Sequence, residues 1–354
     1  MFNIWDSDDH LSHHNSTSQS NLTTCLPSDF TPNHQPTQPQ PHPHPPMPQY
    51  TIFVSGATGT VGGSVARNLL AAGVAVHALD RDPSSPAAKA LSSLGASLTL
   101  GGYVDEGALE KAMSGVTGAF LNLMPDFVDH DWELRTAKRI MAAAKEAGAT
   151  HFIYSSSFSV DAPQKLEYWD PESFTATVLL SKQAIENEVR NAGFEHWTIL
   201  RPGNFTANYI LPLAAVFPDL ANKGRFITAL KPETKLPTVD PNDIGQFALA
   251  AYRDPDKFHA QEISLASELL TADEITEKLA RFTGKDIKAV YLSNEEVEAQ
   301  KGGNPFLAGQ LAMRDMEQFA DIEGTRSWGV AFGTFDEYLK REKDRVTETY
   351  GHLA

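Results

Sequence analysis

The sequence has 354 residues, with 29 Lys and Arg against 45 Asp and Glu, a formal net charge of −16 and one cysteine, Cys25. A single thiol excludes a small fold built on internal disulfides, and the negative charge disfavours a protein that reads nucleic acid through a basic surface. No apolar run approaches the roughly 20 residues that span a bilayer, and the N-terminus lacks the features of a secretory signal. We therefore expect a soluble cytoplasmic protein that binds neither nucleic acid nor membrane.

Residues 1–48 differ in composition from the rest of the chain. They contain no Lys or Arg, four Asp, six of the 12 His and nine of the 22 Pro. Few apolar side chains are present to offset the loss of chain entropy, so we predict a disordered leader that includes Cys25. Its histidines indicate either transient metal binding or simply a solvated tail. The remaining 306 residues carry 29 basic and 41 acidic side chains, enough chain for one large domain or two unequal lobes.

The first ordered unit has the pattern of a dinucleotide-binding site. It comprises a short apolar strand, a glycine-rich turn and a run of helix-forming residues, at 51–54, 55–63 and 64–72. Gly56 permits a tight turn, Gly59 lets the backbone approach a pyrophosphate, and Gly62 lets the helix pack closely on the sheet. The helix dipole and free N–H groups would then face the phosphates.

A second strand at 74–79 ends at two residues with opposite implications for the cofactor. Asp80 lies 24 residues after Gly56, near the position where an acid binds the adenosine ribose. Arg81 could instead hold a 2′-phosphate, with help from Ser84 and Ser85, although the Asp80 carboxylate would repel that phosphate. We favour NADP(H) through Arg81 and leave NAD(H) open.

The chain continues as alternating helices and strands. Helices are predicted at 86–94, 105–114, 132–147 and 177–191, and strands at 96–100, 117–123, 151–155 and 196–200. Such alternation predicts an α/β fold, a Rossmann doubly wound parallel sheet with helices on both faces. Ligands in such sheets bind beyond the carboxyl ends of the strands.

Several motifs in this order resemble the NmrA-like family of atypical short-chain dehydrogenases/reductases, which includes fungal nitrogen regulators, redox sensors and reductases. They are GATGTVG at 56–62, RDP at 81–83, LSKQAIE at 180–186, LRPGNF at 200–205, VDPNDIG at 239–245 and TFDEYL at 334–339. The resemblance covers about residues 50–342. It implies a Rossmann lobe at 49–203, a smaller, mainly helical lobe at 204–342 interleaved with Rossmann elements, and a C-terminal tail at 343–354.

The resemblance also implies NAD(P) binding by residues of several loops. The positions that match cofactor contacts of the family are Gly56, Ala57, Thr58, Gly59, Thr60, Val61, Arg81, Ser84, Ser85, Tyr103, Val104, Leu123, Met124, Pro125, Lys182, Asn204, Phe205, Thr206 and Ala207.

The chain lacks the Tyr-x-x-x-Lys pair that ordinary short-chain dehydrogenases use for proton transfer. None of the nine tyrosines precedes a lysine by four residues, and Val178 stands four residues before Lys182. In the similar isoflavone-reductase-like branch a lysine at the corresponding helix position is the acid/base. Lys182 is therefore expected either to transfer the proton itself or only to hydrogen-bond the nicotinamide ribose. Ser156 could polarise a substrate carbonyl, or could instead cap loop backbone groups.

Two functions fit these features. The first is an NADP(H)-dependent oxidoreductase that transfers hydride to or from a small apolar metabolite. The alternative is a catalytically silent NAD(P)-sensing regulator that acts through a protein partner. No metal is expected, because the sequence has no Cys pair and no His-Glu-x-x-His motif. We assign Asp240 and Asp243 to loop and helix capping, and His151 to a structural role.

Overall fold

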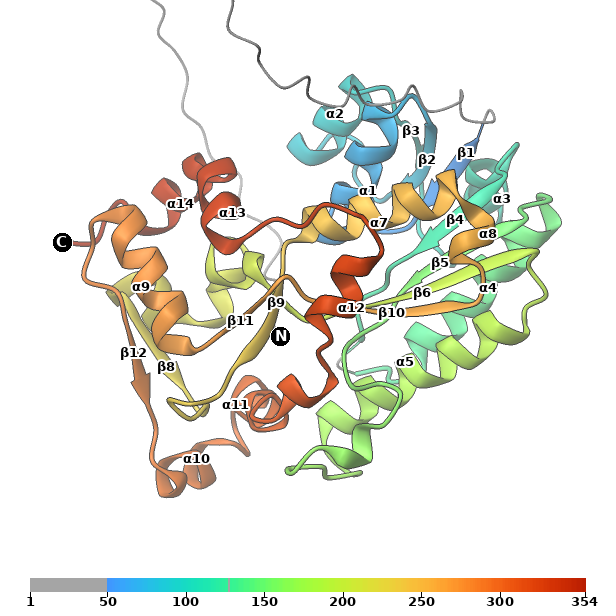
Figure 1. Ribbon diagram of the computed structural model, residues 1–354. Coiled ribbons are helices and arrows are strands. Elements are labelled where there is room, and N and C mark those ends of the chain that lie inside the picture. The colour runs from blue at the N-terminus through green and yellow to red at the C-terminus, as the bar shows by residue number, and fades with distance from the viewer. Residues whose placement is uncertain (1–49, 127) are drawn as a thin grey trace, which may run out of the picture. The chain divides into compact units, whose positions relative to one another are not determined.

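Seven parallel strands form the central sheet of the computed structural model, which describes residues 50–126 and 128–354 (Figure 1). Their order is β10-β6-β5-β4-β1-β2-β3. The strands are β1 (Thr51–Val54), β2 (Ala75–Asp80), β3 (Ser97–Leu100), β4 (Gly118–Leu121), β5 (His151–Ser155), β6 (His196–Pro202) and β10 (Gln261–Leu265). The predicted Rossmann fold is confirmed. The leader at 1–48, with Cys25, lies outside the described residues.

The strand order reverses beside β1, which pairs with β2 on one side and β4 on the other. Ile52 is in register with Val76 of β2 and with Gly118 of β4. The carboxyl ends of β1 and β4 therefore border the switch point, where α/β sheets of this kind bind ligands.

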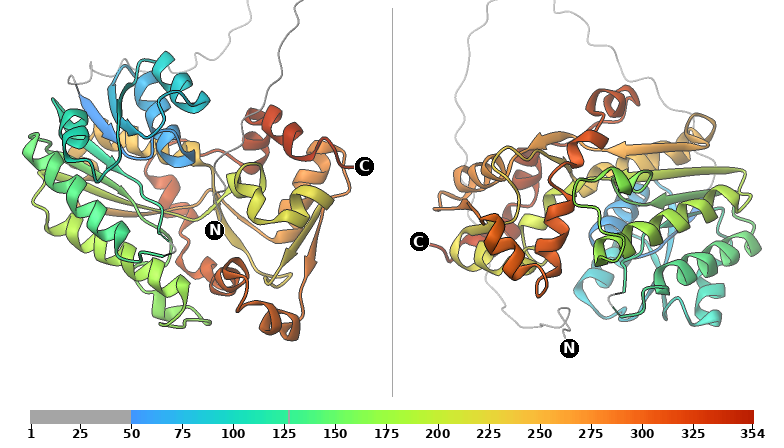
Figure 2. Two further views of the ribbon diagram at one scale, coloured as in Figure 1. Left: turned by 180° about the vertical axis from the view of Figure 1, so that it is seen from behind. Right: turned by 90° about the horizontal axis from the view of Figure 1, so that it is seen from below.

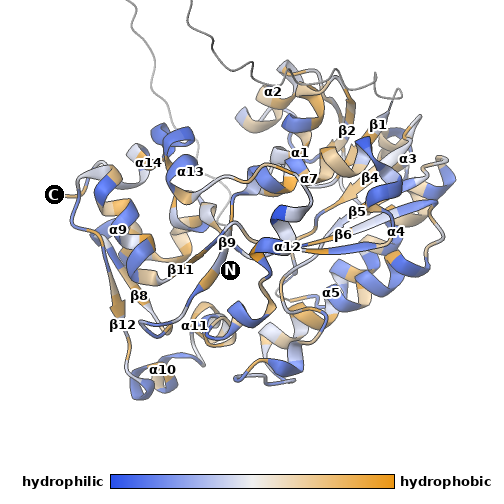
Figure 3. Cartoon of the chain, in the orientation of Figure 1, coloured by the Kyte–Doolittle hydropathy of each residue, from blue (hydrophilic) through white to orange (hydrophobic). Residues whose placement is uncertain are grey.

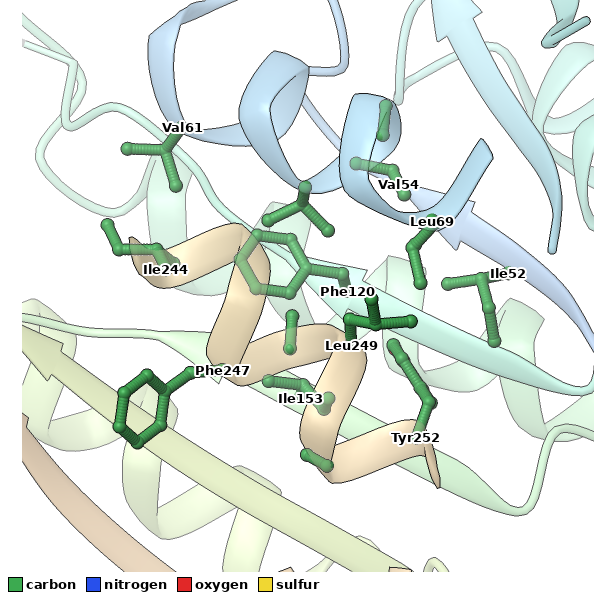
Figure 4. Close-up of a cluster of buried hydrophobic side chains, with 14 of the residues drawn as sticks. Ile52, Val54, Val61, Leu69, Phe120, Ile153, Ile244, Phe247, Leu249 and Tyr252 are labelled. Carbon is green, nitrogen blue, oxygen red and sulfur yellow. The ribbon is translucent and has the colours of Figure 1, made fainter. Parts of the chain in front are cut away.

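Helices cover both faces of this sheet, as strand alternation requires. Ile52 and Val54 pack against α1 (Thr60–Ala71) and α7 (Pro241–Arg253), and Figure 4 shows this cluster. The side chain of Phe53 belongs to the opposite cluster. That cluster contains residues of α3 (Glu106–Met113), α4 (Trp132–Glu146) and α5 (Phe174–Asn191). Helix α2 (Pro86–Ser93) packs on the same face of the sheet as α1.

The chain after β6 forms a second hydrophobic core, and one of its strands, β10, joins the central sheet. Strands β7 (Asn204–Phe205), β9 (Leu236–Val239) and β11 (Glu268–Leu270) form one small sheet, and β8 (Arg225–Thr228) with β12 (Lys288–Tyr291) forms another. The helices here are α6 (Pro218–Lys223), α8 (Pro255–Phe258), α9 (Ala272–Thr283), α10 (Asn294–Gln300), α11 (Pro305–Ala312), α12 (Ile322–Ser327), α13 (Phe335–Arg341) and α14 (Lys343–Tyr350). Figure 2 shows these elements from two further sides. Helix α14 occupies the segment expected as a tail, and its Val346 and Tyr350 are buried.

Polar and apolar residues alternate along the surface helices (Figure 3). In α4, the buried positions Ala137, Ile140 and Ala144 recur at helical spacing. Among the described residues, no helix has both the length and the apolar character needed to cross a membrane.

Candidate functional site

The glycine-rich turn after β1 has the shape of a phosphate cradle. Gly56 adopts φ +61°, a left-handed conformation that favours glycine. A Cβ on Gly62 would lie 2.3 Å from the Gly56 carbonyl oxygen, so only glycine fits this approach of helix to turn. Gly59 is the N-cap of α1 and provides no side chain to accept its first N–H groups. These donors are therefore left for an anion, and the residues present fit the pyrophosphate of a dinucleotide.

The other predicted residues of this turn lie within or beside it. Thr60 and Val61 open α1, and Ala57 is buried. Tyr103 reaches the turn from the loop after β3, where its hydroxyl accepts the backbone N–H of Gly56 at 2.8 Å. Burial raises the pKa of the Tyr103 phenol, which therefore remains protonated.

The Asp80 carboxylate is fixed at the end of β2. Its Oδ2 accepts from the Thr58 hydroxyl at 2.8 Å, and its Oδ1 accepts from the backbone N–H of Asp82 at 2.7 Å. Thr58, predicted as a cofactor contact, thus orients the carboxylate of Asp80 at the end of β2. These hydrogen bonds fix the Asp80 carboxylate at the carboxyl edge of the sheet, where the adenosine end of a dinucleotide lies in folds of this kind.

The three residues predicted to bind a 2′-phosphate have different roles in the loop. The Ser84 hydroxyl donates to Asp82 at 2.5 Å, and the Ser85 hydroxyl caps α2 by accepting the Ala88 N–H at 3.2 Å. The exposed Arg81 makes no hydrogen bond or ion pair with any described residue. Arg81 is consequently the member of the set whose donors are all available to a ligand.

The loops after β3 and β4 contribute apolar surface. Val104 and Met124 are 67% and 69% exposed, whereas Leu123 is buried in the core and Pro125 is half-buried. The end of β4 is tied to β1, because the Ser55 hydroxyl donates to the Asn122 carbonyl at 2.9 Å and accepts its N–H at 2.7 Å.

Lys182 lies on the buried face of α5 and forms an ion pair that the sequence did not predict. Its Nζ donates to Oε1 of Glu133 at 2.7 Å, and the two side chains are 10% and 1% exposed. The other carboxylate oxygen accepts from the Ser181 hydroxyl at 3.2 Å. The structure therefore places a paired ammonium, rather than an isolated lysine, at this position.

Two buried hydroxyls lie next to each other at the end of β5. Apart from each other, neither the Tyr154 hydroxyl nor the Ser156 hydroxyl has a hydrogen-bond partner among the described residues. Burial, followed by the charges of Glu133 and Glu186, raises the pKa of Tyr154 well above its ordinary value. The Ser156 backbone N–H donates to the Leu200 carbonyl at 2.7 Å, and its buried hydroxyl neighbours the hydroxyl of Tyr154.

The predicted residues at 204–207 connect the Rossmann core to the second core. Asn204 donates through Nδ2 to the Tyr209 hydroxyl at 2.8 Å, and Phe205 packs against both cores. Thr206 and Ala207 are buried, and the Thr206 hydroxyl has no partner among the described residues.

The acidic pair in the VDPNDIG motif is structural, as predicted. Asp240 caps α7 by accepting the Asn242 N–H at 2.8 Å, and it also receives two hydrogen bonds from Arg341, at 2.7 and 2.8 Å. Asp243 accepts the Gly333 N–H at 2.9 Å. His151 is buried at the amino end of β5, away from the edge that binds ligands.

Hollows found among the described C-terminal residues involve none of the predicted site residues. One, of about 300 Å³, lies between residues of α6 and α14, including Ala221 and Thr349. Another, of about 150 Å³, lies between Phe217 and Phe306. Because the glycine turn and the other predicted cofactor residues gather at the carboxyl edge of the main sheet, the candidate site is placed there instead.

Comparison with known proteins points to one family. The model of the NmrA-like family matches residues 48–339. A (4-alkanoyl-5-oxo-2,5-dihydrofuran-3-yl)methyl phosphate reductase of Streptomyces griseus is 31% identical, over 67% of this chain and 75% of that protein. The NmrA-like family domain-containing oxidoreductase hkm9 of Aspergillus hancockii is 30% identical, over 66% of this chain and 72% of that protein.

A solved structure has the same fold. It is the NADPH-dependent quinone oxidoreductase QOR2 of Escherichia coli complexed with NADPH. The TM-score is 0.62 at 24% identity, and the match covers 82% of this chain and 99% of the other.

Proposed function

Because the chain belongs to the NmrA-like family, we propose that it is an NADP(H)-dependent oxidoreductase that transfers hydride to or from a small apolar metabolite, with Lys182 beside the nicotinamide. The expected oxidoreductase class is confirmed by relatives that are themselves an oxidoreductase and a reductase. The observation that carries the proposal is the phosphate cradle. The N-terminus of α1 has no side-chain cap. A Cβ on Gly62 would lie only 2.3 Å from the Gly56 carbonyl oxygen, so helix and turn are in close contact.

The protein's own residues supply binding and proton transfer. The N–H groups at the start of α1 would hold the pyrophosphate of a bound cofactor, and Arg81 would bind a 2′-phosphate. The Ser156 hydroxyl donates to the substrate carbonyl oxygen, and the Lys182 ammonium gives that oxygen its proton. When bound, the nicotinamide cofactor supplies the hydride.

A mutation of Lys182 tests the proposal. NADPH oxidation is measured with a panel of quinones, enones and aldehydes, and NADPH affinity is measured by fluorescence titration. We expect Lys182→Ala to lower kcat by about 100-fold or more, the usual size of a general-acid contribution. Turnover that is unchanged in Lys182→Ala would remove Lys182 from the mechanism, and absence of NADPH binding would reject the cofactor.

Lys138→Ala is the matched control. Lys138 lies on α4 and pairs with Glu188 of α5 at 2.7 Å, but the two side chains are 54% and 40% exposed. Exposed pairs of this kind contribute about 0–1 kcal/mol, so its loss should leave both turnover and NADPH affinity unchanged.

A second candidate function is a catalytically silent NAD(P)-sensing regulator. The observation that favours it is Val178, which stands where the catalytic tyrosine of ordinary short-chain dehydrogenases would lie. This function requires a protein partner whose affinity differs between the NADP⁺-bound and NADPH-bound forms. Cofactor binding without turnover of any acceptor, together with such a difference in pull-down, would favour the regulator over the enzyme.

A further inference from the structure

Glu133 and Lys182 interrupt the apolar faces of two helices that pack together. Glu133 shares the buried face of α4 with Ala137 and Ile140. Lys182 shares the buried face of α5 with Leu179 and Ile185. Since α4 and α5 are in contact along these faces, the two charges meet in the interior.

Stability alone does not account for this pair. Removing two charges from water costs several kcal/mol per ion, and apolar residues of similar volume at such positions are often equally stable or more so. The same two helices are also joined by Lys138 and Glu188 at the surface, where no such cost arises. The buried pair therefore points to a requirement for a charged, oriented Lys182.

The surroundings of the pair leave polar groups available. An ammonium has three donors, and Glu133 is the acceptor that the described residues provide for Lys182. Tyr154 near the end of β5 and Ser156 directly after the strand carry buried hydroxyls with no partner among the described residues other than each other, at the edge where sheets of this kind bind ligands. Glu133 thus holds one donor of Lys182, and the remaining donors are free to face cofactor and substrate.

We propose that Glu133 is a positioning residue, which holds the Lys182 ammonium in one orientation so that its other N–H groups reach the nicotinamide ribose and the substrate oxygen. This inference rests on the proposed function. The carboxylate acts through Lys182 and has no contact of its own with the reacting atoms.

The test separates kcat from binding. We expect Glu133→Gln, which keeps the shape but removes the charge, to lower kcat by at least about 10-fold, a fraction of the general-acid contribution. The KM of the acceptor and the Kd of NADPH should change by less than kcat does, since Lys182 makes one of several contacts with each ligand but supplies the proton alone. Glu133→Asp, which retains the charge, should recover more turnover than Glu133→Gln. Glu188→Gln is the matched control on the exposed pair and should match the wild-type protein.

A second variant separates positioning from folding. In Glu133→Leu/Lys182→Met both charges are removed, so thermal unfolding should return toward the wild-type midpoint while turnover stays as low as in Lys182→Ala. NADPH binding by each sample verifies its fold. If Glu133→Gln does not fold, Glu133→Asp tests the positioning role. Its shorter side chain keeps the charge but shifts the ammonium, so its turnover should fall below wild type but exceed that of Lys182→Ala.

The outcomes distinguish the two proposals. If Lys182→Ala is impaired while Glu133→Gln retains wild-type kcat, the positioning role is overturned and the proposed function stands. Wild-type kcat in Glu133→Asp, where Glu133→Gln cannot fold, also overturns it. If the wild-type protein turns over no acceptor, the proposed function fails and the positioning role fails with it.

Discussion

Asp80 and Arg81 are adjacent at the end of β2 and have opposite effects on a 2′-phosphate. The Asp80 carboxylate is held by Thr58 and by the Asp82 N–H, so it cannot easily turn away. Arg81 is exposed and carries a charge that suits phosphate. The balance between these two side chains, rather than the net charge of the chain, should set the choice of cofactor.

Substitutions at these two positions should therefore move cofactor preference in opposite directions. We expect Arg81→Ala to weaken NADPH binding relative to NADH by about 10-fold, which corresponds to about 1.4 kcal/mol for a lost charge-assisted contact. Asp80→Asn should strengthen NADPH relative to NADH by a few-fold, because it removes the repulsion. The measurement is the ratio of the two Kd values by fluorescence titration. A ratio that neither variant changes would show that the phosphate lies elsewhere.

At this scale, sequence patterns indicate most of the proposed site residues but not Glu133. Lys182 and the glycines belong to motifs with fixed spacing, so the resemblance locates them. Glu133 belongs to no motif, although its position on the apolar stripe of the predicted helix 132–147 indicates that it is buried. Its partner could not be predicted, because the pairing depends on how α4 and α5 pack.

At the scale of elements, α1 is positioned by close contacts on two sides. Gly62 approaches the turn at Gly56, and a Cβ on Gly245 of α7 would lie 2.8 Å from the Ser64 carbonyl oxygen. Glycines at these two positions let α1 pack tightly against both the turn and α7. The phosphate cradle therefore depends on helix packing as well as on the turn itself.

Gly62→Ala should damage this arrangement. Its Cβ would lie 2.3 Å from the Gly56 carbonyl oxygen, so the turn has to move. We expect a loss of about 1–3 kcal/mol in the free energy of unfolding, typical of overpacking, and at least about 10-fold weaker NADPH binding. Denaturant unfolding and fluorescence titration measure these two quantities.

Gly107→Ala on α3 is the control for added volume. Its Cβ would meet only Asp105 Oδ1, at 3.8 Å, so the change should be neutral or stabilise the protein by up to about 1 kcal/mol. If Gly62→Ala behaved like Gly107→Ala, the close approach of α1 to the turn would not be required.

Element boundaries agree with the sequence prediction where the residue pattern is strong, and they differ where a cap or close packing extends a helix. The strand at 151–155 is observed as predicted. Helix α1 begins at Thr60, before the predicted Ser64, because tight packing makes Gly62 and Gly63 favourable inside the helix. Helix α5 begins at Phe174 instead of Thr177, because the Ser173 hydroxyl caps it by accepting the Ala176 N–H. The small sheets after β6 pair distant segments, which spacing alone cannot reveal.

At the scale of the whole folded unit, an acidic cluster ties the C-terminal helices to the Rossmann part. Asp240 on α7 pairs with Arg341 of α13, and Asp243 accepts the N–H of Gly333. Burial raises the pKa of Asp243 to about 8, and the nearby Asp240 charge adds to the increase, against the effect of the Gly333 hydrogen bond. The folded protein should therefore keep this acid protonated at neutral pH.

Stability should consequently decrease as pH rises. The folded-state pKa of Asp243 lies above its ordinary value of 3.8, so its stabilising protonation is complete below that pH and is lost as pH approaches about 8. Between pH 6.5 and 8, the unfolding free energy of the wild-type protein should fall relative to Asp243→Asn by about 1 kcal/mol per pH unit, with the slope decreasing toward pH 8. This range avoids His151, because burial lowers the pKa of its imidazole to about 3 and its titration affects stability below pH 6.5.

Urea unfolding of both proteins across this pH range measures the effect. Parallel free-energy curves for wild type and Asp243→Asn would mean that Asp243 is ionised in the folded protein. The cluster would then contribute a constant term to stability instead of a pH-dependent one.

The proposed function is tested most directly by following the hydride itself. NADPH carrying deuterium at nicotinamide C4, prepared separately for each face, is mixed with the wild-type protein and each acceptor of the quinone, enone and aldehyde panel. The proposed mechanism predicts that deuterium from one face leaves the nicotinamide and, with an enone or an aldehyde, appears on carbon in the reduced acceptor, and that Lys182→Ala slows this transfer by about 100-fold. Tight binding of NADPH with the label retained on the nicotinamide for every acceptor would contradict it.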